Sequence, residues 1–215
     1  SSDLGRKLVG DRTAKTKLKE VRITESQFAD DAALYAGNRQ AFESTATTFA
    51  STASEWGLTM SIGKTKGMVV GQGLSEGDTG PVQVGDGSLE IVDNFTYLGT
   101  VISRDAEVTN EVNCRISKAS RAFGSLRKAV FQNPKLSLAT KRSVYRATVL
   151  SVLLYGAETW TLKSSHSRRL NTFHNQCMRT ILGLSRYQQW QEQMTTANLA
   201  SMFGMQQSID RKSVV

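Results

Sequence analysis

Two adjacent aspartates, Asp30 and Asp31, are the residues of this 215-residue sequence whose type and spacing best suit chemistry. Val21 and Ile23 before the pair alternate with polar residues, and the alternation resumes after it at Leu34. The segment is therefore predicted to form two short strands joined at the acidic pair, which would lie at a hairpin tip. Two carboxylates roughly 5 Å apart repel each other by about 3 kcal/mol at an effective dielectric constant of about 20.

The neighbours of the acidic pair are mostly apolar: Phe28, Ala29, Ala32 and Ala33. A divalent cation at the hairpin tip would remove the repulsion between the carboxylates. Mg²⁺ prefers hard oxygen ligands of this kind and leaves other coordination positions to water and substrate phosphate. The alternative is an Asp-Asp turn whose side chains hydrogen-bond to their own backbone.

Four later stretches follow the acidic hairpin and a helix in a recognisable order. They are residues 57–66 (GLTMSIGKTK), 95–102 (FTYLGTVI), 154–160 (LYGAETW) and 173–183 (FHNQCMRTILG). This order spans nearly the whole chain and resembles the second half of the palm, and the region after it, in reverse transcriptases of non-LTR (LINE-type) retrotransposons.

The resemblance implies a fragment of an RNA-directed DNA polymerase, which transfers nucleotides with two Mg²⁺ ions. It assigns Asp30 the principal metal-ligand role and Asp31 a supporting one. A third aspartate normally comes from an earlier palm strand, and Asp3 and Asp11 lack the apolar strand context to replace it. We expect the isolated chain to be inactive as a nucleotidyltransferase. The implied partners are an RNA template, a DNA primer duplex and deoxynucleoside triphosphates.

The same resemblance assigns roles to two further places. Lys64 would face the nucleotide triphosphate, although Ser61 stands where the family usually has asparagine. Tyr97, Leu98 and Gly99 resemble the primer grip, a hairpin whose backbone holds the primer 3′ end. The alternatives are that lysines at Lys64 and Lys66 protect a strand edge, and that Gly99 only permits a tight bend.

The fold class predicted from the hydrophobic pattern is α+β. Residues 1–20 read as a basic lead-in and residues 71–81 as a loop, with strands expected at 58–62, 68–70 and 82–102 around a turn at residues 85–87. One helix after Gly37 carries an apolar stripe that ends at Gly57. We assign this stripe to the core: Phe42, Ala46, Phe49, Ala53 and Trp56.

After Asp105 the pattern becomes helical, with one helix ending near Pro134, a second capped by Ser137, and a third over residues 164–182. A further helix is expected around residues 198–210. Together with the resemblance, this gives residues 1–105 as the C-terminal half of a palm, an antiparallel sheet with a packed helix. Residues 106–186 would be a thumb-like helical bundle, and 187–215 the truncated start of a post-thumb segment.

The charge distribution differs sharply between the two halves of the chain. Residues 1–110 contain 11 Lys and Arg against 15 Asp and Glu, whereas residues 111–215 contain 16 against 4. A net charge of +12 in the second half indicates a polyanionic partner or a solvated basic surface. Arg115 and other basic residues lie off the apolar helix stripes. The candidates for phosphate contacts are Lys118, Arg121, Arg127, Lys128, Lys141, Arg142 and Arg146.

Several other classes of protein fit the sequence poorly. No apolar run approaches the roughly 20 residues that span a bilayer, and Cys114 and Cys177 are too few for a disulfide framework. We expect an intracellular protein, nuclear at its site of action if functional, with no membrane partner. His174 and Cys177 could share a helix face, for which core packing is a simpler interpretation than zinc.

A second functional hypothesis does not require chemistry. The chain could be a remnant whose basic helical half binds nucleic acid without catalysis. Duplex binding with a steep salt dependence, indifferent to Mg²⁺ and to Asp30→Ala, would favour this alternative.

Overall fold

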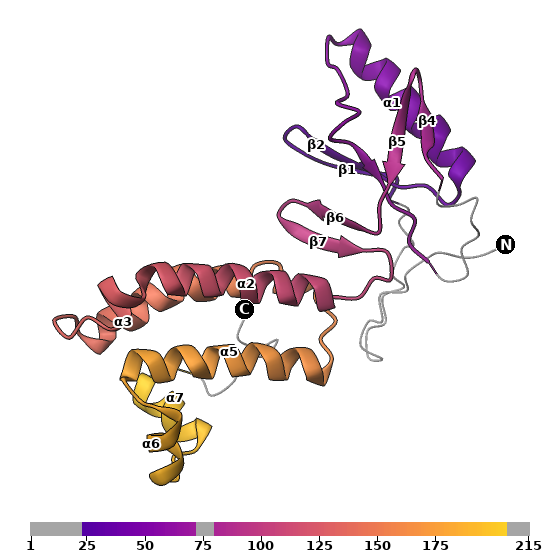
Figure 1. Cartoon of the computed structure of the whole chain (residues 1–215). Coiled ribbons are helices and arrows are strands. Elements are labelled where there is room, and N and C mark those ends of the chain that lie inside the picture. Colours follow the sequence, from indigo (N-terminus) through magenta and orange to yellow (C-terminus); the bar gives the residue numbers. More distant parts are fainter. Residues whose placement is uncertain (1–22, 72–79, 206–215) are drawn as a thin grey trace, which may run out of the picture. The chain divides into compact units, whose positions relative to one another are not determined.

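The computed structural model describes residues 23–71 and 80–205, and the chain divides into two compact units, residues 1–98 and 99–215 (Figure 1). The first unit is mixed α and β, and the second is mostly helical. The basic lead-in, Asp3, Asp11, most of the 71–81 loop and the end of the helix expected at 198–210 lie outside the described residues.

The first unit begins with the predicted hairpin. Strands β1 (Glu25–Phe28) and β2 (Asp31–Leu34) pair antiparallel, with Phe28 opposite Asp31. Helix α1 (Arg39–Glu55) follows, and its first turn is capped by Asn38, whose Oδ1 accepts a hydrogen bond from the Ala41 N–H at 2.8 Å. Gly57 follows the helix with φ +73°, a conformation that glycine adopts without strain.

A three-stranded sheet covers one side of α1. Its order is β3 (Lys66–Gly67), β5 (Gly87–Ile91) and β4 (Val82–Val84), with β3 parallel and β4 antiparallel to β5. The predicted turn is confirmed: Val84 lies opposite Gly87, so Gly85 and Asp86 form a two-residue loop. The buried core between helix and sheet consists of Ala46, Val82, Val84 and Leu89.

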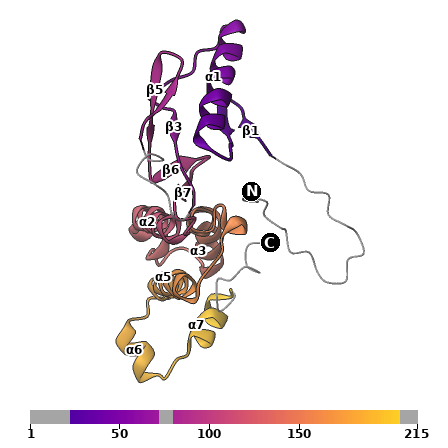
Figure 2. The same ribbon diagram turned by 90° about the vertical axis from the view of Figure 1, so that its right-hand side faces the viewer.

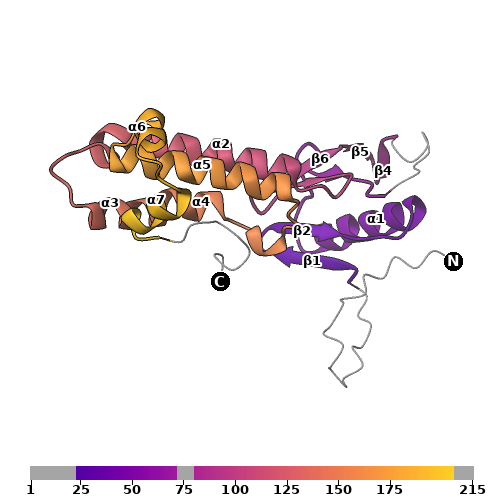
Figure 3. The same cartoon turned by 90° about the horizontal axis from the view of Figure 1, so that it is seen from below.

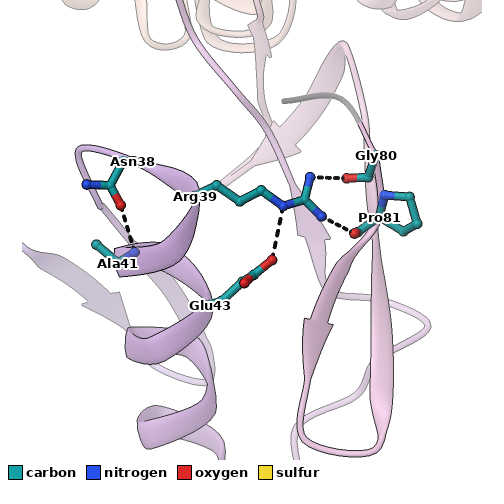
Figure 4. A network of polar contacts seen from close by, with 6 residues as sticks. All are labelled: Asn38, Arg39, Ala41, Glu43, Gly80 and Pro81. Atoms are coloured by element: carbon teal, nitrogen blue, oxygen red, sulfur yellow. Dashed lines mark hydrogen bonds and ion pairs between the residues drawn. The ribbon is translucent and has the colours of Figure 1, made fainter. Parts of the chain in front are cut away.

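Arg39 joins the start of α1 to the chain entering β4, as Figure 4 shows. Its guanidinium donates to the carbonyls of Gly80, at 2.9 Å, and of Pro81, and its Nε donates to Glu43 at 3.0 Å. Arg39 thus bonds to Gly80 and Pro81, which lie 41 and 42 positions later in the sequence.

Three predictions for the first unit are wrong. Residues 58–62 form no strand, because the Ser61 carbonyl accepts hydrogen bonds from the N–H groups of Lys64 and Thr65 and closes a turn. The strand expected at 68–70 is instead β3, two residues earlier. Trp56 is 80% exposed rather than in the core. It comes after the last residue of α1, and its backbone, with φ −94° and ψ 11°, has left the helical conformation that the apolar stripe assumes.

Strands β6 (Asn94–Tyr97) and β7 (Thr100–Ser103) form a separate two-stranded sheet. Leu98 and Gly99 are the two residues between these strands. Both have positive φ, +47° and +79°, which matches the right-handed twist of the strands on either side of a two-residue hairpin loop.

The three helical segments predicted for the second unit are confirmed (Figures 2 and 3). Helix α2 (Thr109–Leu126) continues as the π-helical turn η2 (Arg127–Phe131) before Pro134. Helix α3 (Leu138–Val144), capped by Ser137, runs on through η3 (Tyr145–Leu150) and α4 (Ser151–Leu153). A 3-10 turn, η4 (Ala157–Thr159), leads to α5 (Ser164–Leu182), and α6 (Arg186–Gln191) and α7 (Thr196–Phe203) follow.

Helices α2, α3 with its continuation, and α5 enclose one large core, and α7 packs on α5. Phe123 and Phe131 stack with ring centroids 4.5 Å apart, and both rings meet Tyr145 edge-on. Trp160, Leu170 and Phe203 are also fully buried. Among the described residues, no helix has the length and apolar character that crossing a membrane requires.

Candidate functional site

The acidic pair lies where the sequence predicts it, at the tip of the β1–β2 hairpin. Ala29 and Asp30 form the two-residue loop, and Asp31 is the first residue of β2. Both carboxylates are exposed, and the neighbouring Phe28 is itself 65% exposed. The apolar surface expected beside the pair therefore faces solvent in this unit.

The backbone beside the two carboxylates is strained. Ala29 has φ +54°, in the left-handed region where a side chain costs roughly 1–2 kcal/mol. The equivalent loop position in the β4–β5 hairpin is Gly85, with φ +56° and no such cost. Strain of this kind concentrates at functional sites.

The predicted metal site at this hairpin has no further ligands among the described residues. No group of three or more His, Cys, Asp or Glu side chains that could hold a metal ion is found in the described ranges, 23–71 and 80–205. Asp30 and Asp31 have the hard oxygen donors that Mg²⁺ prefers, but two carboxylates do not complete a two-metal centre.

Lys64 lies in a turn rather than on a strand. Its side chain is exposed, and the Ser61 carbonyl accepts hydrogen bonds from the Lys64 N–H at 3.1 Å and from the Thr65 hydroxyl at 2.9 Å. Lys66, two residues later, donates to Glu90 of the neighbouring strand at 2.7 Å. The nucleotide-facing role of Lys64 stays a prediction.

The predicted grip residues, Tyr97, Leu98 and Gly99, form the end of β6 and the loop after it. Within the first unit, the Tyr97 hydroxyl donates a long hydrogen bond of 3.5 Å to the carbonyl of Ser26 in β1. The predicted grip and the strand that precedes the acidic loop are thus in contact. Within the second unit, the Gly99 carbonyl accepts a hydrogen bond from Arg115 at 2.6 Å.

The basic residues of the second unit divide into two groups. Arg121, Arg127, Lys128 and Arg146 are exposed, whereas Lys118, Lys141 and Arg142 are half-buried. Arg142 donates from Nη1 to the Phe203 carbonyl at 3.2 Å, so its charge lies at the C-terminal end of α7. Arg142 therefore has a structural partner that the sequence analysis did not foresee.

Arg115 differs most from its expected position. It is 5% exposed rather than on a solvated helix face, and its Nε donates to Glu111 at 2.5 Å. The sequence does contain a signal for this pair, since Glu111 precedes Arg115 by four residues at the start of α2. From the sequence, Arg115 was placed off the apolar stripe with the other basic residues and was not paired with Glu111.

His174 and Cys177 lie in the core, as the packing interpretation predicts. The His174 Nδ1 and the Tyr145 hydroxyl are 2.9 Å apart in a buried hydrogen bond. Burial raises the pKa of the Cys177 thiol to about 12, which favours the neutral form that packs in an apolar core. Burial likewise raises the pKa of Tyr145 well above its usual value.

Comparisons with known proteins give one match. The chain is similar to an uncharacterised transposon-derived protein of Caenorhabditis elegans, with 29% identity over 174 residues. The alignment covers 78% of this chain and 59% of the relative, so the chain spans less than two thirds of that protein's length. No family profile and no solved structure matches the chain.

Proposed function

We propose that this chain is of transposon origin and supplies the C-terminal palm and thumb portion of a non-LTR reverse transcriptase. The observation that carries the proposal is the acidic pair at the tip of a two-residue hairpin whose first strand, β1, accepts a hydrogen bond from Tyr97 at the Ser26 carbonyl. The order of the later stretches, which resembles this family, and the transposon-derived relative support the same origin.

Each part of the proposal rests on a specific feature. Asp30 and Asp31 would contribute carboxylate oxygens to Mg²⁺, and Lys64 would neutralise triphosphate charge. The exposed cations of α2, η2 and η3 would contact the phosphates of the template–primer duplex, which positions the duplex without reading its sequence. Because no third potential metal ligand joins Asp30 and Asp31 within the described residues, the chain alone is expected not to extend primers.

The direct test joins the chain to the polypeptide encoded upstream in the same frame and measures Mg²⁺-dependent primer extension on RNA. Asp30→Asn should abolish extension, because it removes a charged metal ligand. Asp86→Asn is a matched control, since Asp86 occupies the same second position of a two-residue hairpin loop. Equal activity of both variants would contradict the assignment of Asp30. Extension by the isolated chain, abolished by Asp30→Asn, would contradict its predicted inactivity.

A second candidate is a binding remnant without catalysis. Two observations favour it: the acidic pair has the same incomplete ligand set, and the second unit carries exposed cations. A stop codon or unrelated sequence upstream of Ser1, with duplex binding that ignores Mg²⁺ and Asp30→Asn, would support this candidate. An open frame that encodes an aspartate after an apolar strand would contradict it.

A further inference from the structure

A buried ion pair lies against the start of β7. Glu111 is 1% and Arg115 5% exposed, and the Arg115 Nε donates to Glu111 Oε1 at 2.5 Å. Glu111 belongs to the first turn of α2, where the helix dipole favours a negative charge. Each charge therefore has a close partner, as buried charges require.

Each member of this pair makes a further hydrogen bond to the backbone of the hairpin. The Arg115 Nη2 donates to the Gly99 carbonyl at 2.6 Å, and Glu111 Oε2 accepts from the Val101 N–H at 2.7 Å. The two charged side chains thus hold the backbone on both sides of Thr100. Hydrogen bonds to charged groups are about twice as strong as neutral ones.

Tyr155 and Gly156 contact Arg115 and Thr100, respectively. The Arg115 guanidinium carbon lies 4.4 Å from the centroid of the Tyr155 ring, in a cation–π contact. A Cβ on Gly156 would lie 3.1 Å from the Thr100 hydroxyl, so the backbone approaches β7 closely here. Residues of the 95–102 and 154–160 stretches are therefore in contact.

Stability alone explains this arrangement poorly. A buried ion pair commonly stabilises a fold no better than apolar side chains of the same volume. An apolar pair, however, could not bind the carbonyl of Gly99 or the N–H of Val101. The function that these charged side chains can perform, and that apolar ones cannot, is to fix the backbone of this hairpin.

We propose that Arg115 and Glu111, covered by Tyr155, are positioning residues that hold the Gly99–Val101 backbone where the hairpin engages the 3′ end of a primer. This proposal rests on the proposed function, which gives the hairpin its primer-binding role. The geometry adds the residues that fix it. Misplacement of a positioning backbone by about 1 Å can reduce a reaction rate about 100-fold.

The test uses the whole chain and an RNA–DNA primer–template with 2-aminopurine as the last primer base. The fluorescence of this base reports engagement of the 3′ end, and a distant fluorescein reports total duplex binding. Hydrogen exchange at the Val101 amide reports the backbone bond itself. The variants are Arg115→Gln, Glu111→Gln and, as the conservative rescue, Arg115→Lys.

In Arg115→Gln and Glu111→Gln we expect Val101 to exchange at least about 10-fold faster and 3′-end engagement to fall at least about 10-fold. Total duplex affinity should stay within about twofold, because neither side chain is available to phosphates, and Arg115→Lys should restore part of the 3′-end signal. Lys163→Gln, in an exposed ion pair with Glu107, should change neither reading. Ile181→Val should lower stability without changing 3′-end engagement.

Different results would contradict the positioning bond, its role at the primer, and the primer-binding role of the hairpin. Unchanged Val101 exchange in Glu111→Gln would overturn the positioning bond, and faster exchange with an unchanged 3′-end signal would overturn its role at the primer. A wild-type chain that binds duplex without any 3′-end signal would instead remove the grip from the proposed function. The positioning role would then fall with it, whatever the exchange rates.

Discussion

The two units differ in how firmly they hold their candidate functional residues. Among residues 23–71 and 80–98, which the structure describes in the first unit, four apolar residues form the buried core, while Ile23, Trp56 and Leu58 are each about two thirds exposed or more. Phe28 is similarly exposed. In the described part of the second unit, residues 99–205, sixteen buried residues form one core. The candidate metal ligands therefore lie in a unit with a small apolar core, and the candidate phosphate-binding residues lie in a unit with a large one. Duplex binding should persist under conditions that perturb the acidic hairpin.

The sharpest contrast between the units is between two tryptophans. Trp160 is 1% exposed in the second unit, so Trp160→Ala should lower its free energy of unfolding by about 3–5 kcal/mol. Trp56 is 80% exposed, so Trp56→Ala should change stability by less than about 0.5 kcal/mol. Denaturant unfolding followed by residue-level hydrogen exchange would measure both. Similar losses from the two variants would erase the contrast.

The next comparison is between a buried and an exposed ion pair, both in the second unit. Arg115→Ala leaves Glu111 charged and buried, which should cost about 3–5 kcal/mol. Lys163→Ala breaks the exposed pair with Glu107 and should cost at most about 1 kcal/mol. Urea unfolding of the two variants tests the difference, and an equal cost would mean that Arg115 is solvated in solution.

Alkaline pH should weaken the second unit selectively. The pKa of Cys177 is about 12 in the fold against 9.0 for an ordinary thiol, so the folded state holds this proton more tightly. Its stabilising effect is complete below about pH 9 and is lost between about pH 9 and 12, by up to about 1.4 kcal/mol per pH unit. Cys177→Ala should flatten this slope in unfolding measurements between pH 8 and 10.5. An unchanged slope would mean that the loss of stability at alkaline pH comes from other groups, including Tyr145.

The two hairpin loops of the first unit should respond in opposite directions. Ala29→Gly should slow exchange in the β1–β2 hairpin, since it relieves left-handed strain of about 1 kcal/mol. Gly85→Ala introduces the same strain in the β4–β5 loop and should speed exchange there by a similar free energy. If Ala29→Gly destabilises the hairpin, then alanine stabilises it by more free energy than the left-handed strain costs.

Much of the fold could be predicted because its signals are local. Apolar residues at helical spacing gave the bounds of α5, Ser137 marked the start of α3, and Gly85-Asp86 gave the β4–β5 loop. The alternation at residues 58–62 misled because backbone bonds to the Ser61 carbonyl compete with an extended strand. The alternation of apolar residues placed the acidic pair at a hairpin tip, but it predicted neither the exposure of the pair nor the strained conformation of Ala29.

What the sequence could not predict depends on contacts distant in the chain. The partners of Arg115 include the backbone of Gly99, and the partner of Arg142 is the carbonyl of Phe203, 61 residues away. No periodicity encodes such contacts, so both arginines were grouped with solvated cations. The four exposed cations stay the better candidates for phosphate contact: Arg121, Arg127, Lys128 and Arg146.

The measurement that tests the account most directly is the affinity of the whole chain for an RNA–DNA duplex over a series of salt concentrations. The wild-type chain should bind with a linear fall of log affinity against log salt, because bound cations displace counterions from phosphate. A variant with Arg121, Arg127 and Arg146 changed to glutamine should reduce that slope by about 2–3. Absence of binding, or a slope that the triple variant leaves unchanged, would contradict a nucleic-acid role for this unit.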